Sequence, residues 1–253
     1  MSLDGRTILV TGASKGIGAS IVRALGEQGA DVVAHYGGDE AGAREATAAI
    51  PDDRKLLLQA DLIDPEAPAK LWAEAVAWRG PIDVLVLNAA VMLETALDAE
   101  ESIWNEAWER TVRVNVLAPA SLVREAVRHF REHGGGTLIT LSSWAAQRGA
   151  GNSDLVAYAA SKAAVKAMAQ TIARNHAADG VLSYVVAPGV VRTGMSERAA
   201  ASRGGEEALT ATLAMGEWVP PDDVAGLVAF LATGRVRHLT GATLDVNGAS
   251  YIR

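Results

Sequence analysis

Short runs of β-branched residues and leucine recur along the chain, and longer alanine-rich stretches with helical periodicity separate them. Each run is bounded by Gly, Pro, Asn or Asp, which are residues that favour turns. This alternation predicts parallel strands joined by helices that cover both faces of one sheet. Strands are expected at Thr7–Val10, Asp31–His35, Leu56–Gln59, Asp83–Leu87, Thr137–Leu141, Leu182–Val186 and Thr243–Val246.

The alanine-rich stretches predict the connecting helices, at Gly16–Gln28, Glu40–Ile50, Pro65–Trp78, Ser102–Glu132, Leu155–Ala178 and Pro221–Ala232. No proline-rich or serine-rich linker divides the chain, and 253 residues are few for two independent α/β domains. We therefore expect one α/β domain, residues 1–253, with a doubly wound, seven-stranded parallel sheet flanked by helices. A segment at about 192–216 interrupts the alternation, and position alone leaves open a substrate-side flap or a surface excursion.

Composition excludes several functional classes. The apolar share of 49% is too high for a disordered chain, and a net charge of −7 disfavours nucleic-acid or membrane-surface binding. The chain has no cysteine, which excludes disulfides and thiolate catalysis, and its five histidines lack metal-binding spacing, so no catalytic metal is predicted. Its start does not look like a signal peptide and its apolar runs are short, so we expect a cytoplasmic protein.

A glycine-rich turn follows the first predicted strand. The sequence TGASKGIG, residues 11–18, lies between that strand and an amphipathic helix. Glycines let the backbone approach a pyrophosphate, whose charge is met by N–H groups at the helix N-terminus. The strand–turn–helix context favours a dinucleotide site on a Rossmann-type fold over a plain turn. The candidate residues here are Gly12, Ser14, Lys15, Gly16, Ile17 and Gly18.

The end of the second strand bears on the choice of cofactor. Enzymes that favour NAD usually place a carboxylate there to bind the adenosine ribose, but this chain has none before Asp39. Lys15 in the glycine turn could pair with a 2′-phosphate; the alternative for it is a solvated surface residue. We therefore expect NADP(H) as the preferred cofactor, with NAD(H) as the alternative.

Tyr158 and Lys162 stand four residues apart in a predicted helix, so both side chains share one face. A free tyrosine has a pKa of about 10 and is a poor acid or base near neutral pH. A neighbouring ammonium, aided by the positive nicotinamide of the oxidised cofactor, stabilises phenolate and lowers this pKa. Tyrosine can then exchange a proton with an alcohol or ketone oxygen. A Tyr/Lys pair on a helix is usually structural by itself, but the glycine turn earlier in the chain favours a catalytic role for this one.

Six ordered motifs carry a resemblance to a known family. They are the turn of residues 11–18, Asp61-Leu62, Asn88-Ala89-Ala90, the pair Tyr158 and Lys162, the segment Pro188–Thr193, and residues 239–249. Over essentially its whole length the chain resembles the short-chain dehydrogenase/reductase family, particularly 3-oxoacyl-acyl-carrier-protein reductases and glucose dehydrogenases.

The resemblance implies roles for single residues. Tyr158 would be the general acid in reduction, and Lys162 would bind ribose hydroxyls and lower the tyrosine pKa. Of the adjacent Ser142 and Ser143, we choose Ser143 as the residue that hydrogen-bonds the substrate oxygen. Asn115 would hold a water in a proton relay, although a lone helical asparagine is ordinarily satisfied by backbone. Cofactor contacts would come from Asp61, Leu62, Asn88, Ala89, Pro188, Gly189, Val191 and Thr193.

Two departures from the family pattern bear on the substrate side. Tyr158 follows Ser143 by 15 residues, about two more than is common, which suggests an insertion at Ala150–Val156. Ala90 replaces the usual glycine behind the cofactor. Trp144 directly follows the proposed catalytic serine. It either lines the substrate pocket or only packs in the protein, and the sequence favours the two interpretations equally.

These features together predict an NADP(H)-dependent oxidoreductase that interconverts a ketone or aldehyde and an alcohol. An NAD-linked alcohol dehydrogenase of the same family and a non-catalytic dinucleotide sensor are the alternatives. The partners expected are a small-molecule carbonyl or alcohol substrate and, by family habit, further copies of the chain in a homodimer or homotetramer. The residues do not identify the substrate.

Overall fold

The computed structural model describes residues 2–201 and 204–253. Seven strands form one parallel sheet in the order β3-β2-β1-β4-β5-β6-β7, which confirms the predicted fold class. The strands are β1 Thr7–Thr11, β2 Asp31–Tyr36, β3 Lys55–Gln59, β4 Val84–Leu87, β5 Gly136–Leu141, β6 Val181–Pro188 and β7 Thr243–Val246.

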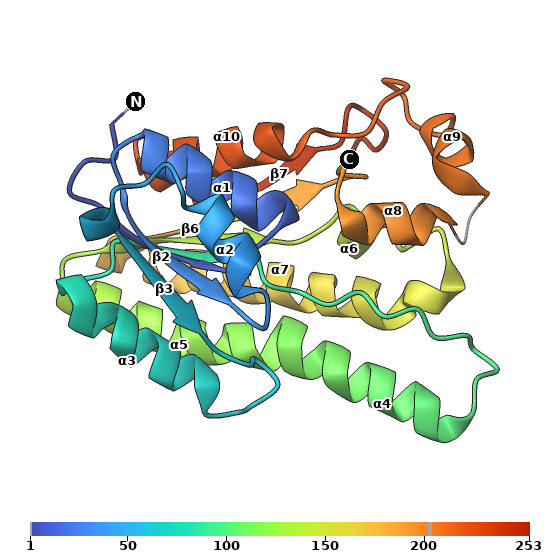
Figure 1. The fold of residues 1–253 in the computed structure, drawn as a ribbon, viewed down its shortest axis with the longest axis horizontal. Helices are drawn as coiled ribbons and strands as arrows, with labels where there is room; N and C mark the ends of the chain where they lie inside the picture. Colours follow the sequence, from blue (N-terminus) through green and yellow to red (C-terminus); the bar gives the residue numbers. More distant parts are fainter. Residues whose placement is uncertain (1, 202–203) are drawn as a thin grey trace.

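Helices cover both faces of the sheet (Figure 1). Helix α1 (Gly16–Glu27) and helix α10 (Pro221–Ala232) pack side by side on one face, with the short α2 (Glu40–Ala46) beside α1. Helices α3 (Ala67–Arg79), α5 (Ala118–Glu132) and α7 (Val156–His176) cover the other face. Central strands such as β1 and β4 are buried along their whole length, which is why they read as unbroken apolar runs.

The long helix predicted at Ser102–Glu132 is wrong as one regular helix. The structure has α4 (Glu101–Val112), a π-helical turn η2 (Arg113–Leu117) and then α5. Pro119 carries no N–H to donate to the carbonyl of Asn115 four residues earlier, so regular helical bonding is interrupted there. This π-helical turn contains Asn115, whose side chain is held against Val91. Its Oδ1 accepts the Val91 N–H, and its Nδ2 donates to the Val91 carbonyl oxygen.

Other predicted boundaries shift by a few residues. Helix α2 ends at Ala46, and α3 begins at Ala67, because the Asp64 carboxylate accepts the N–H of Glu66 in a turn before the helix. The segment predicted only as a break, at about 192–216, contains α8 (Gly194–Ala201) and α9 (Gly205–Thr210). Ser202 and Arg203 of that segment, and Met1, lie outside the described residues.

Short helical segments lie below the length at which periodicity is informative. They are α6 Ala145–Arg148, η1 Asp52–Arg54, η3 Ser153–Leu155, η4 Ala177–Asp179 and η5 Arg237–Leu239. Both α6 and η3 lie between Ser143 and Tyr158, and η3 falls within Ala150–Val156, where an insertion is predicted. None of the helices described is both long and apolar enough to cross a membrane.

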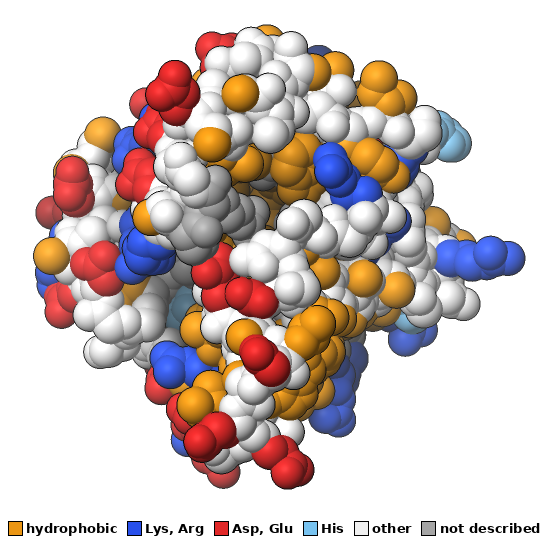
Figure 2. Space-filling model, turned by 90° about the vertical axis from the view of Figure 1, so that its right-hand side faces the viewer, with side chains coloured by type: hydrophobic (Ala, Val, Ile, Leu, Met, Phe, Trp, Pro, Cys, Tyr) orange, Lys and Arg blue, Asp and Glu red, His pale blue; other side chains and the backbone are white. Residues whose placement is uncertain are grey.

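The strand order places the site. From β1 the chain runs outward to β2 and β3, then returns to β4 on the other side of β1. At such a switch point the following connections diverge and leave a crevice at the carboxyl ends of the strands. Figure 2 shows the surface hollowed between the part that carries α8 and α9 and the part that carries α4, with hydrophobic side chains inside the hollow.

Candidate active site

The glycine turn between β1 and α1 lies at this crevice. Gly12 has a φ of +71°, and a Cβ on it would lie 2.9 Å from the Cα of Ala89. A Cβ on Gly18 would overlap the carbonyl oxygen of Gly12. These positions therefore need glycine, and the turn lies tight against the end of β4.

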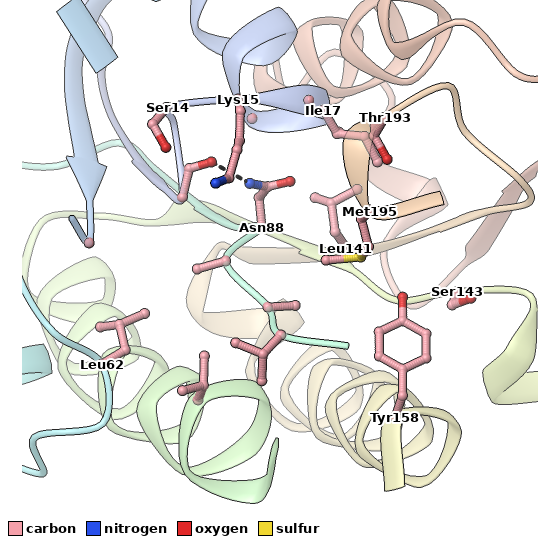
Figure 3. A pocket seen from close by; sticks show the side chains of 18 of the residues that line it. Ser14, Lys15, Ile17, Leu62, Asn88, Leu141, Ser143, Tyr158, Thr193 and Met195 are labelled. Atoms are coloured by element: carbon pink, nitrogen blue, oxygen red, sulfur yellow. Dashed lines mark hydrogen bonds between the residues drawn. The ribbon is translucent and has the colours of Figure 1, made fainter. Parts of the chain in front are cut away.

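Asn88, directly after β4, holds the turn in place. Its Nδ2 donates to the carbonyl oxygens of Thr11 and Gly12, each at 2.9 Å; the bond to Gly12 is drawn in Figure 3. The hydroxyl of Thr11 in turn accepts the N–H groups of Asn88 and Ala89. Ala90, which departs from the family pattern, lines the cleft that these residues border.

The start of α1 is open to an anion. No side chain caps this N-terminus, and its first turn carries no acidic residue. The first N–H groups of a helix lack partners within the helix and carry the positive end of its dipole. Together with glycines that leave no room for a Cβ, this arrangement fits the pyrophosphate of a dinucleotide.

A cleft of about 370 Å³ joins the glycine turn to the predicted catalytic residues. Every residue predicted to contact the cofactor lines it, and so does Ser143. In Figure 3, Ser14 and Lys15 lie on one side of the pocket and Ser143 and Tyr158 on the other, with Asn88 between them. The lining also includes residues that sequence reasoning missed, among them His35, Arg110, Met195 and Arg198.

The two candidate serines have different partners. The hydroxyl of Ser142 donates to the carbonyl oxygen of Lys162 at 2.8 Å, inside the protein. The oxygen of Ser143 accepts the N–H of Ala145 at 3.1 Å. The Ser143 side chain also acts on Tyr158, since it lowers the pKa of the tyrosine. Both serines line the cleft. The Ser142 hydroxyl is used in tying the end of β5 to α7, so Ser143 stays the predicted catalytic serine.

Tyr158 and Lys162 project from α7 toward the carboxyl end of β5. The Lys162 Nζ donates to the carbonyl oxygen of Leu141 at 2.9 Å and lies 5.8 Å from the centre of the Tyr158 ring. Burial lowers the pKa of Lys162 to about 8. Burial raises the pKa of Tyr158 to about 12, with the Ser143 side chain acting in the opposite direction. The lowered tyrosine pKa expected from the lysine is thus not found in the protein alone.

Asn115 lies close to this pair without lining the cleft. It is buried, its Oδ1 accepts the N–H of Val91, and its Nδ2 donates to the Val91 carbonyl and the Ser161 hydroxyl. Ser161 directly precedes Lys162 and donates to the carbonyl of Tyr158. The side-chain amide of Asn115 therefore links the segment after β4 to the helix that carries Tyr158 and Lys162.

Trp144 lies outside the residues that line the cleft. It packs with Ala200, Leu213 and Trp218 in an apolar cluster beneath α8 and α9. The Arg148 guanidinium stacks over its ring at 4.9 Å. The indole thus anchors the segment at about 192–216, and its predicted contact with substrate stays a prediction.

Comparisons with known proteins agree with this arrangement. A family model described as enoyl-(acyl carrier protein) reductase matches residues 12–249. The 3beta-hydroxysteroid dehydrogenase 1 of Eggerthella lenta is 34% identical over 255 residues, which cover 97% of this chain and 94% of that protein.

Solved structures share the fold. A putative NAD(P)-dependent gluconate 5-dehydrogenase from Beutenbergia cavernae, with NADP bound at low occupancy, has a TM-score of 0.88 and 32% identity over 98% of each chain. A 3-ketoacyl-(acyl-carrier-protein) reductase from Brucella melitensis, complexed with NADH, has a TM-score of 0.87 and 27% identity over 99% of this chain and 100% of that one.

The fold and the cleft define an oxidoreductase that uses a nicotinamide dinucleotide. The chain belongs to the short-chain dehydrogenase/reductase family, whose members named above act on hydroxyl or carbonyl groups of small molecules.

Proposed function

We propose that this protein is an NADP(H)-dependent oxidoreductase that interconverts a ketone or aldehyde and an alcohol. The observation that carries the proposal is the single cleft in which the glycine turn and the residues Ser143, Tyr158 and Lys162 meet. A dinucleotide held at the turn can reach the tyrosine only if both border one cavity, and here they do.

Each catalytic side chain has a distinct task in this proposal. The bound nicotinamide supplies or accepts the hydride. Ser143 hydrogen-bonds the substrate oxygen, and the Tyr158 hydroxyl donates a proton to it in reduction and accepts one in oxidation. Lys162 binds the ribose hydroxyls, and the remaining lining residues fix the dinucleotide. Asn115 keeps the helix with Tyr158 and Lys162 in register and holds a water in the relay that resupplies the proton.

The preference for NADP(H) is supported by the surroundings of β2. The carboxylate of Asp39 caps α2 by accepting the N–H of Gly42 at 2.9 Å. Between the end of β2 at Tyr36 and Asp39 the chain has only Gly37 and Gly38, which carry no charge. Lys15 is exposed and lines the same cleft, so it can pair with a 2′-phosphate. Calorimetry should give tighter binding of NADPH than of NADH, and Lys15→Gln should reduce that difference. Tighter binding of NADH would favour the NAD-linked alternative.

A homodimer or homotetramer is also proposed. Helix α4 carries Trp104 and Trp108 with their rings 5.9 Å apart, and Ile103 is 55% exposed on it. An exposed apolar face of this kind suits contact with a second copy. Sedimentation of the purified protein tests this assignment.

The decisive test of catalysis is Tyr158→Phe. The hydroxyl is the proposed proton donor, so turnover of a carbonyl panel should fall by about 100-fold or more. The panel should include cyclic ketones, sugar acids and acyl thioesters, because proteins similar to this chain are named for substrates of those kinds. Dinucleotide affinity, measured by calorimetry, should stay within about twofold, because the phenyl ring remains in the cleft wall.

Tyr184→Phe is the matched control. Tyr184 is buried away from the cleft and donates to the carbonyl of Val236, so its loss should leave turnover unchanged. If Tyr158→Phe kept more than about a tenth of the wild-type rate, its role as general acid would be wrong. Dinucleotide binding without turnover of any carbonyl would instead favour the non-catalytic sensor.

A further inference from the structure

A buried histidine lies under the dinucleotide cleft, and the proposed reaction does not use it. His35 is the penultimate residue of β2 and is 2% exposed. Its backbone is paired with Thr11 of β1 on one side and Leu58 of β3 on the other. The ring therefore lies where the three strands that carry the adenosine half of the cleft end together.

The ring joins two turns that border the cleft. The Gly12 N–H donates to Nδ1 of His35 at 3.1 Å, and Nε2 of the ring lies 3.0 Å from the carbonyl oxygen of Ala60. Gly12 opens the glycine turn, and Ala60 directly precedes Asp61, a predicted cofactor contact. All four residues line the cleft. One side chain thus ties together two walls of the dinucleotide site.

These partners define the protonation state of the ring. A backbone N–H can only donate, so Nδ1 of His35 must be the unprotonated nitrogen. A carbonyl oxygen can only accept, so Nε2 must carry the hydrogen. Only the neutral Nε2–H tautomer satisfies both. In the imidazolium form, an N–H at Nδ1 would face the N–H of Gly12, and the buried donor of Gly12 would lose its acceptor.

The surroundings offer little to stabilise a charged ring. Burial lowers the pKa of His35 below its ordinary value of 6.5, and the bond to Ala60 opposes this shift. None of the charged residues on the segments around the ring pairs with it among the described residues. They are Lys15 after β1, Asp39 and Glu40 after β2, Asp61 after β3, and the pair Glu66 and Lys70 before and on α3.

We propose that neutral His35 is a positioning residue for dinucleotide binding: it holds the turns of Gly12 and Ala60 in the binding arrangement, and its protonation weakens that binding. This inference rests on the proposed dinucleotide function of the cleft. It adds a residue that contacts the turns and not the reacting atoms.

The test is dinucleotide affinity as a function of pH in the intact protein. Calorimetry with NAD⁺ and NADP⁺ should show the dissociation constant rising as the pH falls below about 6.5. The rise should approach about tenfold once the ring is protonated, the effect of one lost buried hydrogen bond. NAD⁺ is the cleaner probe, because it lacks the 2′-phosphate, which itself titrates in this range. A rise seen only with NADP⁺ would overturn the inference.

His35→Asn separates positioning from mere packing. The asparagine oxygen can take the place of Nδ1 and accept from Gly12, but it does not titrate. This variant should bind NAD⁺ near pH 7.5 within about threefold of wild type and should show no weakening in acid. His35→Gln can keep the donor to Ala60 but loses the acceptor for Gly12, so it should bind about tenfold more weakly at every pH. His238→Asn, on the exposed η5, is the control and should keep the wild-type profile.

A second measurement needs no substitution. Long-range ¹H–¹⁵N NMR of the wild-type imidazoles should find the Nε2–H tautomer for His35 near neutral pH, and the opposite tautomer would overturn the inference. A pH profile for His35→Asn that matches wild type would overturn it too, while the proposed function would stand. If wild-type protein bound neither dinucleotide near neutral pH, the proposed function and this inference would fail together.

Discussion

The two halves of the cleft are built in different ways. Around the glycine turn, the structure is fixed by bonds to the backbone: Asn88 and His35 hydrogen-bond the main chain of Thr11 and Gly12. A Cβ at Gly12 or Gly18 would have no room. On the other side, α8 and α9 rest on an apolar cluster around Trp218. There the ion pair between Arg192 and Glu206 is about half exposed.

This difference teaches which part of the site tolerates change. A dinucleotide has one shape, and a backbone cradle fixed by hydrogen bonds suits a ligand that does not vary. A segment held by side-chain packing can be altered residue by residue without disturbing the sheet beneath it. We infer that cofactor binding depends on the first half and that substrate choice depends on the second.

The largest effect is expected for Gly18→Ala, which tests whether dinucleotide binding depends on the tight backbone of the glycine turn. The new Cβ would overlap the carbonyl oxygen of Gly12, so the turn must shift. Dinucleotide affinity should fall by about 100-fold or more, with about 1–3 kcal/mol lost from the free energy of unfolding. Calorimetry and urea denaturation measure the two effects.

Gly226→Ala, on the neighbouring helix α10, is the matched control for Gly18→Ala. Nothing lies within 4 Å of a Cβ at Gly226. This change should leave dinucleotide affinity intact and raise stability by about 0.4–1 kcal/mol, through the entropy of the unfolded chain. Equal binding by the two variants would show that the turn is not a tight backbone cradle.

Much of the fold and most of the cleft could be predicted from the sequence. Parallel central strands are buried on both faces, so runs such as that of Val84–Leu87 are apolar throughout and easy to find. The glycine turn was visible because its geometry requires glycine. The pair Tyr158 and Lys162 follows from helical spacing alone.

The rest depends on long-range contacts. The π-helical turn at Asn115 needs the backbone of Val91, which only the folded chain brings near. The cluster in which Trp144 packs forms with Ala200, Leu213 and Trp218, which lie 56 to 74 positions further along the chain. The sequence places His35 at the end of the predicted second strand but assigns it no role, because its bonds to Gly12 and Ala60 form only in the folded chain.

A smaller effect, on stability, is expected from Lys162, which lines the cleft beside Tyr158. Because burial lowers its pKa from 10.5 to about 8, the unfolded chain binds a proton on this group between those values and the folded protein does not. Stability should therefore rise with pH across that window. The free energy of unfolding of wild type relative to Lys162→Met should increase by up to about 3 kcal/mol from about pH 7.5 to pH 10.5.

Urea denaturation of the dinucleotide-free protein at both pH values checks this expectation for Lys162. Lys166→Met, one turn along the same helix, controls for the loss of a lysine from α7. A constant difference between wild type and Lys162→Met would contradict the burial of an uncompensated ammonium.

The smallest effect is expected in the half of the cleft that carries α8 and α9, for Arg192→Gln. The Arg192 Nη1 lies 2.7 Å from Glu206 and its guanidinium stacks 5.1 Å from the Trp218 ring, but half of each charged side chain is exposed. Exposed ion pairs contribute about 0–1 kcal/mol, so hydrogen-exchange protection of α9 amides should fall by no more than about fivefold. Dinucleotide affinity should not change.

Added salt is the control for the ion pair between Arg192 and Glu206. It should weaken the hydrogen-exchange protection of α9 in wild type and have little effect on the variant, because the variant lacks the ion pair that salt screens. A loss of dinucleotide affinity in Arg192→Gln would show that the segment of α8 and α9 and the glycine turn are one cooperative unit, and the comparison between them would fail.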